Sequence, residues 1–156
     1  MKNLFPLAAA ALFLSACPPS LIPGTEIRDT KENRKLLVLI EQYREAAQRH
    51  DVKAILAMVS PSYYDMRGHP DDPSYHWDYA RLTKELPAQF AKVKDLRLDI
   101  NVRHIETTDH KAKATYFYTE NFIAVMPAGD VPEHNSDINR MEFTRQGDRW
   151  LITSGL

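Results

Sequence analysis

Four side chains that could bind a metal ion lie in one loop rich in turn-forming residues. This loop carries His69, Asp71, Asp72 and His76, and imidazole and carboxylate groups are common ligands of zinc and similar ions. The two histidines do not have the i, i+4 spacing that places such a pair on one helix face, and a polar loop with prolines contains such residues by default. We therefore predict no metal site and no cofactor.

The chain also lacks a nucleophile in a setting typical of a nucleophilic enzyme. Cys17 is the only cysteine, and no serine stands in the glycine-containing turn that exposes a nucleophilic serine. The net charge is −1, with 26% charged and 44% hydrophobic residues, which is an ordinary globular mixture. Because no basic cluster is present, we expect no binding to nucleic acid.

The elements that would position a site begin with two amphipathic helices. Apolar residues recur three or four positions apart from Asn33 onward, which predicts a long helix with one buried face. Thr30 or Asn33 can cap its start. The helix breaks at Asp51, which caps a short second helix that ends before Pro61.

A third helical pattern follows over 79–93. Pro87 lies inside it, and a proline cannot donate a hydrogen bond to the carbonyl four residues earlier. We therefore expect a bend, or two short helices that meet near Leu86.

The second half of the chain changes to a period of two residues, which is typical of strands. Leu98 and Ile100, for example, alternate with polar residues. A polar loop is predicted over 127–135. The predicted strands are 96–103, 111–125, 136–145 and 149–154. Helices followed by an antiparallel sheet predict an α+β fold, with N-terminal helices packed on a curved antiparallel sheet.

Two stretches carry a resemblance to a known superfamily. The string IEQYREAAQRHDVKAILAMVSPSYYD and the final strand DRWLITSGL resemble the nuclear transport factor 2-like domains, also called ketosteroid isomerase-like or polyketide cyclase-like. The resemblance covers residues 30–156. It implies an α+β cone, with a pocket between the sheet and the long helix. It also implies a possible homodimer through the outer sheet face, which an apolar surface around Phe117, Ile123 and Val125 would favour.

The first sixteen residues have the features of an export signal. Lys2 precedes an apolar stretch that is too short for a permanent membrane span. The order Leu-Ser-Ala-Cys at 14–17 resembles the lipobox of bacterial lipoproteins, which implies cleavage before Cys17 and acylation of that cysteine. An ordinary signal peptide or a retained anchor are the alternatives.

The resemblance to lipoproteins also predicts where in the cell the protein lies. Lipid on Cys17 implies attachment to a membrane of the cell envelope, and Pro18 with no acidic residue after the cysteine favours the outer membrane over the inner one. Residues 17–29 are rich in proline and are predicted to be an extended tether, able to hold the domain a few tens of ångström from the membrane at about 3.1 Å per residue.

Catalysis of the ketosteroid isomerase kind is one hypothesis for the pocket. Tyr43 lies where the resembled enzymes carry a tyrosine that donates a hydrogen bond to the developing enolate. The position of their catalytic aspartate falls on Arg67, and a guanidinium cannot accept a proton at ordinary pH. The base is therefore absent unless Asp65 substitutes for it. We favour the alternatives, in which Tyr43 is a core residue and Asp65 a carboxylate at a strand end or turn.

Plain binding is the hypothesis that we favour. Amphipathic aromatic residues could line a mostly apolar cavity for a small apolar molecule, with Arg140 as an orienting polar group. Each aromatic residue could instead belong to the core. Arg140 could instead form a structural ion pair with Asp137, Glu142 or Glu120. The candidate ligand-binding residues are Tyr43, Tyr63, Tyr116, Tyr118, Arg140 and Trp150. We expect a binding or interaction module, with an isomerase or hydrolyase using Asp65 and Tyr43 as the rival.

Overall fold

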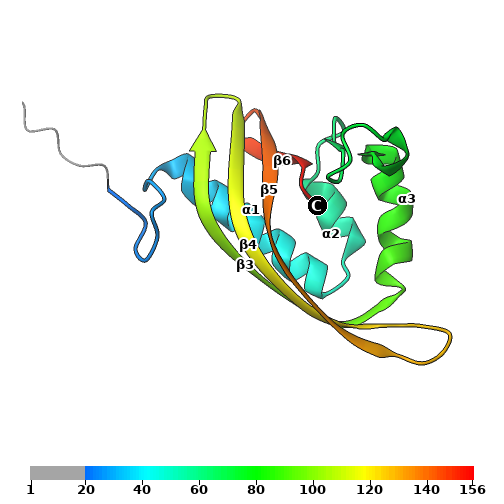
Figure 1. The fold of residues 1–156 in the computed structure, drawn as a ribbon. Coiled ribbons are helices and arrows are strands. Elements are labelled where there is room, and N and C mark those ends of the chain that lie inside the picture. Colours follow the sequence, from blue (N-terminus) through cyan, green and yellow to red (C-terminus); the bar gives the residue numbers. More distant parts are fainter. Residues whose placement is uncertain (1–19) are drawn as a thin grey trace, which may run out of the picture.

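Helices cover one side of a curved antiparallel sheet in this computed structural model, which describes residues 20–156 (Figure 1). The helices are α1 Lys31–Gln48, α2 Val52–Met58 and α3 Tyr79–Phe90, with a short 3-10 helix η1 Pro73–Tyr75. The strands are β1 Tyr64–Asp65, β2 Trp77–Asp78, β3 Val93–Thr107, β4 Lys111–Ala124, β5 Val131–Gln146 and β6 Arg149–Ser154. The predicted α+β arrangement is confirmed.

Local side-chain caps set the start of the first two helices. The Thr30 hydroxyl accepts a hydrogen bond from the Asn33 amide at 3.1 Å, so Thr30 is the cap of α1. Asp51 caps α2 as predicted, because its carboxylate accepts a bond from the Ala54 amide at 2.9 Å. The apolar face of α1, including the buried Leu36, packs on the inner side of the sheet.

Pro87 does not divide the third helix. The structure has one helix through Pro87, so the predicted pair of short helices is wrong. Pro87 lies in the last turn, where few hydrogen bonds depend on it, and its own carbonyl still accepts a bond from the Ala91 amide at 3.0 Å. A proline near the end of a helix removes only one intrahelical bond.

The main sheet has the strand order β3-β4-β5-β6, and every neighbouring pair is antiparallel. Strand β5 begins at Val131, earlier than the predicted start at residue 136, because its register with β4 continues outward to the pair Ala124↔Val131. The residues predicted to form a polar loop over 127–135 therefore lie mostly in an exposed hairpin. This hairpin projects beyond the helices (Figure 1).

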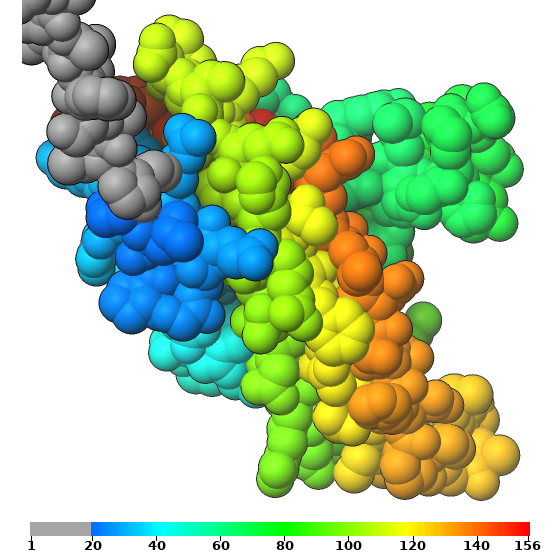
Figure 2. Space-filling model, turned by 60° about the vertical axis from the view of Figure 1, so that its left-hand side comes forward, coloured from blue at the N-terminus to red at the C-terminus, as the bar shows by residue number. Residues whose placement is uncertain are grey.

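The N-terminal segment folds back on the domain instead of running as an extended tether. Leu21 and Arg28 form an antiparallel bridge, and the Asp29 amide donates a hydrogen bond to the Ser20 carbonyl at 2.7 Å. Ile27 is only 2% exposed and belongs to the core. Figure 2 shows this segment in blue beside the yellow-green β3. Burial of Ile27 explains why residues 20–29 are held.

Candidate ligand-binding site

A cavity of about 570 Å³ lies between the helices and the inner face of the sheet. Helices α1, α2 and α3, strand β2 and the inner row of β4 all contribute to its wall. Most of the wall is apolar, and the alternation of strand residues turns the Phe122 ring inward. The main apolar residues of the wall are Ile55, Leu82, Leu86, Phe90, Phe122 and Met126. We call this space the main cavity.

Two hydrogen-bond donors and one carboxylate stand out in the wall of the main cavity: Tyr43, Arg67 and Glu120. Within residues 20–156, the Tyr43 hydroxyl and the Arg67 guanidinium have no hydrogen-bond or ion-pair partner. We call these two side chains the cavity donors. Glu120 accepts a hydrogen bond from the Asn135 side chain at 3.0 Å.

The electrostatic environment keeps Tyr43 protonated. Burial raises the pKa of Tyr43 to about 12; the negative charge of Glu120 acts in the same direction, and the positive charge of Arg67 acts in the opposite one. The phenol is therefore a neutral donor at physiological pH. Glu120 and Arg67 line the same cavity as Tyr43.

An aromatic ring supports the Arg67 guanidinium. The guanidinium carbon lies 4.2 Å from the centre of the Trp77 ring, a distance typical of a cation–π contact. Arg67 is exposed and also lines the main cavity, so it lies where the cavity meets solvent. Its backbone has a φ of 50°, in the left-handed region that non-glycine residues rarely adopt.

The predicted alternative base, Asp65, is not part of the main cavity. Its Oδ1 accepts a hydrogen bond from the Arg67 amide at 2.6 Å, and its Oδ2 accepts one from the Gly155 amide at 2.6 Å. The hydroxyls of Tyr63 and Ser154 donate to the same Oδ2 at 3.3 and 3.4 Å. We call these contacts the Asp65 cluster. Asp65 is only 9% exposed and joins β1 to the chain that follows β6.

The predicted aromatic ligand residues do not share one wall. Tyr63 belongs to the Asp65 cluster, and the buried Tyr116 donates a hydrogen bond to the Gly155 carbonyl at 3.1 Å. Burial raises the pKa of both phenols. Tyr118 is half-buried and packs against Tyr116, with 6.3 Å between the ring centres. Of the six candidates, only Tyr43 lines the main cavity.

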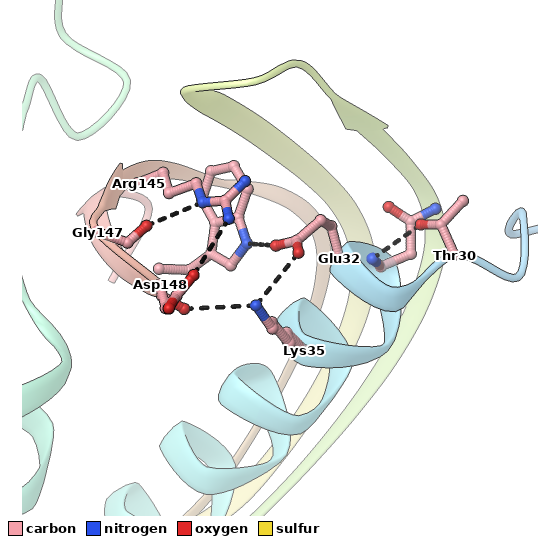
Figure 3. Close-up of polar contacts among 8 residues, drawn as sticks. Thr30, Glu32, Lys35, Arg145, Gly147 and Asp148 are labelled. Carbon is pink, nitrogen blue, oxygen red and sulfur yellow. Dashed lines mark hydrogen bonds and ion pairs between the residues drawn. The ribbon is translucent and has the colours of Figure 1, made fainter.

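Trp150 and Arg140 lie elsewhere in the fold. The Trp150 indole donates a hydrogen bond to Glu32 at 2.7 Å. Lys35 donates to the same carboxylate at 3.2 Å, as Figure 3 shows. Both contacts lower the pKa of Glu32, the Trp150 bond having the larger effect. The Trp150 bond joins the start of α1 to β6, whereas the Lys35 bond lies within α1. Arg140 is exposed on β5 and lies 3.6 Å from the Glu142 carboxylate.

The loop with potential metal ligands is held by its own hydrogen bonds. The His76 ring contacts the Tyr64 hydroxyl at 2.6 Å and the His69 carbonyl at 2.7 Å, and Asp72 accepts a bond from the Ser74 amide at 3.0 Å. Across residues 20–156, no three such side chains form a group that could hold a metal ion. These residues therefore shape the loop that follows Arg67.

Cys17 and the predicted signal peptide lie outside the described residues. From Ser20 to Leu156, the structure contains no helix long and apolar enough to span a membrane. The proposed lipid attachment therefore rests on the sequence alone.

Sequence reasoning missed most of the main cavity. Arg67 was considered only as a replacement for a base, and Glu120 only as an ion-pair partner for Arg140. The inward direction of Glu120 could have been found from strand alternation, because it follows Tyr116 and Tyr118 at a spacing of two. The contribution of α3 could not be read from its amphipathic pattern, which gives the buried face but not what that face covers.

Comparison with known proteins identifies the fold. No protein-family model matches the sequence, and no curated protein matches it significantly. Solved structures do match. A ketosteroid isomerase-like protein from Erwinia carotovora atroseptica gives a TM-score of 0.64 at 16% identity, over 81% of this chain and 94% of that one.

Two further solved structures agree. A nuclear transport factor 2-like superfamily protein from Salmonella enterica gives a TM-score of 0.63 at 15% identity, over 81% of this chain and 90% of that one. A conserved protein from Planctomyces limnophilus gives a TM-score of 0.68 at 9% identity, over 80% and 92%. The domain therefore has the nuclear transport factor 2-like fold. At such identities the likeness extends to the fold alone.

Proposed function

We propose that this protein is a cell-envelope lipoprotein whose nuclear transport factor 2-like domain binds a small, mostly apolar molecule without transforming it. The main cavity carries this proposal. Its volume of about 570 Å³ lies in the range of ordinary small-ligand sites. An apolar wall with a few polar groups gives affinity from the wall and orientation from the polar groups.

The state of Asp65 supports binding over catalysis. A general base must reach the proton that it removes and must have a free lone pair for it. Asp65 already accepts two short backbone hydrogen bonds and does not line the main cavity. The Arg67 guanidinium cannot serve as a base either.

A specific observation keeps the rival, an isomerase or hydrolyase, as a second candidate. The Glu120 carboxylate lines the same cavity as the Tyr43 phenol, so a proton acceptor and a proton donor face one space. Turnover that is lost in both Glu120→Gln and Tyr43→Phe would favour this candidate over plain binding.

We also propose that lipid on Cys17 holds the domain at a membrane, the outer membrane being favoured by Pro18. Ser20 is already tied to Asp29, and the three residue steps that separate Cys17 from Ser20 in the sequence can bridge at most about 10 Å. The domain would then lie close to the membrane surface. Substitution Cys17→Ser should move the protein from the membrane fraction to the soluble fraction, whereas a Ser variant that stays with the membrane would contradict the lipid anchor.

A second copy of the chain is a further proposed partner. Ile138 is 65% exposed and lies opposite Phe117 in the β4–β5 register, on the outer face of the sheet. Val125, expected on that face, lines the main cavity instead. Native mass spectrometry shows whether the protein is a dimer, and Ile138→Lys should then shift the dimer to a monomer. A dimer that is insensitive to Ile138→Lys would exclude this face.

The first test of ligand binding is native mass spectrometry of the protein purified from its own host, under gentle and then denaturing conditions. We expect a small molecule that is released on denaturation. The variant Leu86→Trp fills the main cavity and should abolish this mass difference, whereas Val38→Trp adds the same ring to the exposed side of α1 and should retain it. An empty protein, or equal ligand content in both variants, would contradict the proposal.

A further inference from the structure

The cavity donors lack acceptors within the protein. The Tyr43 hydroxyl and the Arg67 guanidinium both line the main cavity, and neither bonds to another group in the described part of the chain. A phenol has one O–H donor, and a guanidinium has five N–H donors and no acceptor. The site therefore offers donors and positive charge to whatever enters it.

The setting of Arg67 suits an oxyanion. The guanidinium carbon lies 4.2 Å from the centre of the Trp77 ring, and its N–H groups bond to no other group within residues 20–156. A planar guanidinium matches the two oxygens of a carboxylate, and hydrogen bonds between such charged groups are about twice as strong as neutral ones. Lys92 adds a second positive charge to the lining of the cavity.

The remainder of the cavity suits an apolar body. Leu86 and Phe90 of α3 face Phe122 of β4 across it, and each square ångström of apolar surface that a ligand buries contributes about 25 cal/mol. Glu120 is the exception, because its carboxylate would repel an anion placed beside it. An anionic group must therefore lie on the Arg67 side of the cavity.

We propose that the main cavity selects a monocarboxylate with an apolar body, whose carboxylate accepts hydrogen bonds from Arg67 and Tyr43. This inference rests on the proposed function and adds the chemical class of the ligand. The apolar body lies along Leu86, Phe90 and Phe122. The acceptor role falls to the ligand because no group within residues 20–156 accepts a hydrogen bond from the cavity donors.

Three compounds of equal shape test the inference by isothermal titration calorimetry of the full chain: 4-phenylbutyrate, 4-phenylbutanol and 4-phenylbutylamine. We expect the carboxylate to bind at least tenfold more tightly than the alcohol, and the amine to bind most weakly. In Arg67→Gln, carboxylate affinity should fall at least tenfold, because a charge-assisted hydrogen bond is lost, while alcohol affinity changes less than twofold. The carboxylate affinity of Arg67→Lys should lie between that of the unchanged protein and that of Arg67→Gln.

Matched variants separate a local effect from a general loss of positive charge. Arg97→Gln removes a guanidinium from the outer face of β3 and should leave carboxylate affinity within twofold. Glu120→Gln should strengthen carboxylate binding several-fold by removing the repelling charge. The carboxylate preference is overturned if the alcohol or the amine binds as tightly, if Arg67→Gln has no effect, or if none of the three compounds binds. The proposed function is tested separately, by the ligand content of the cavity-filling variant Leu86→Trp in native mass spectrometry.

Discussion

The Asp65 cluster and the cavity donors are neighbouring polar regions that differ in whether their side-chain hydrogen-bonding groups have partners. Asp65 is buried, and each of its carboxylate oxygens accepts a short backbone hydrogen bond. The side chains of Tyr43 and Arg67 face a cavity, and their donors have no acceptor in the described part of the chain. Burial without a partner costs free energy, so a protein keeps such donors where water or a ligand can reach them. The contrast indicates that the Asp65 cluster stabilises the fold, whereas the cavity donors are open to a ligand, as the proposed function requires.

The largest effect is expected from removal of the Asp65 carboxylate. Asp65→Ala leaves the amides of Gly155 and Arg67 and the Tyr63 hydroxyl without their acceptor, and each buried unpaired group costs about 1 to 3 kcal/mol. We expect the free energy of unfolding, measured in urea, to fall by about 3 to 5 kcal/mol. Asp71→Ala removes an exposed carboxylate and should have almost no effect. A small loss in Asp65→Ala would show that Asp65 is free for chemistry after all.

A somewhat smaller loss is expected at Gly155, whose φ is +94°. A Cβ at this position would overlap the Arg140 carbonyl and lie 2.8 Å from the Met141 Cα, so Gly155→Ala must displace the backbone that carries the Asp65 bond. Unfolding free energy should fall by about 2 to 4 kcal/mol.

The control for Gly155 is another glycine with a positive φ. Gly147 has a φ of +59° and open space around the added Cβ, so Gly147→Ala bears only the conformational cost of about 1 kcal/mol. Equal losses in the two variants would contradict the role of close packing at Gly155.

The smallest effect is expected from Tyr43→Phe at neutral pH, because no intramolecular hydrogen bond of the hydroxyl is lost. Unfolding free energy should change by less than about 0.5 kcal/mol. A loss above about 1 kcal/mol would reveal a hydrogen bond to the hydroxyl, which would then be structural and not a cavity donor.

Alkaline pH sharpens the same comparison. The pKa of Tyr43 is about 12 in the folded state against an ordinary value of 10.0. The folded protein therefore holds this proton more tightly, and the corresponding stability is complete below pH 10 and is lost as pH rises to about 12. Tyr63 and Tyr116 also have raised pKa values and add to this decline. Denaturant titrations between pH 9 and 12 should show a shallower decline in Tyr43→Phe, and an unchanged slope would contradict the raised pKa.

Periodicity and capping were sufficient to predict the order of helices and strands. The spacing around Leu36 and the Asp51 cap are local signals, which can be read from the sequence without knowledge of tertiary contacts. The long β5 was underestimated, because β4 pairs with polar residues whose composition resembles a loop. Folding of residues 20–29 was missed for a similar reason, since a single buried Ile27 outweighs a proline-rich composition.

The candidate site was less predictable than the fold. Asp65 and Gly155 are far apart in sequence, and only the tertiary structure brings the Gly155 amide to 2.6 Å from the Asp65 Oδ2. Trp150 and Arg140 were predicted as ligand residues from their residue type alone. Whether a strand residue lines a cavity depends on the sheet face to which its side chain points and on the element that covers that face. Tyr43 lines the cavity, in keeping with its place on the apolar face of the helix, and its role in ligand binding stays a prediction.

The hydrogen bond between Gly155 and Asp65 also affects when the chain can fold during synthesis. Val59 pairs with Ile152 in a parallel bridge, and the Ser60 amide donates to the Ile152 carbonyl at 2.8 Å, so a second connection of the same span accompanies it. Contacts between such distant segments close slowly, because the chain entropy of a large loop must be lost first. Residues 149–155 must therefore leave the ribosome before α2 and β1 reach their final packing. Folding is expected to be a late, concerted event, not a progressive one.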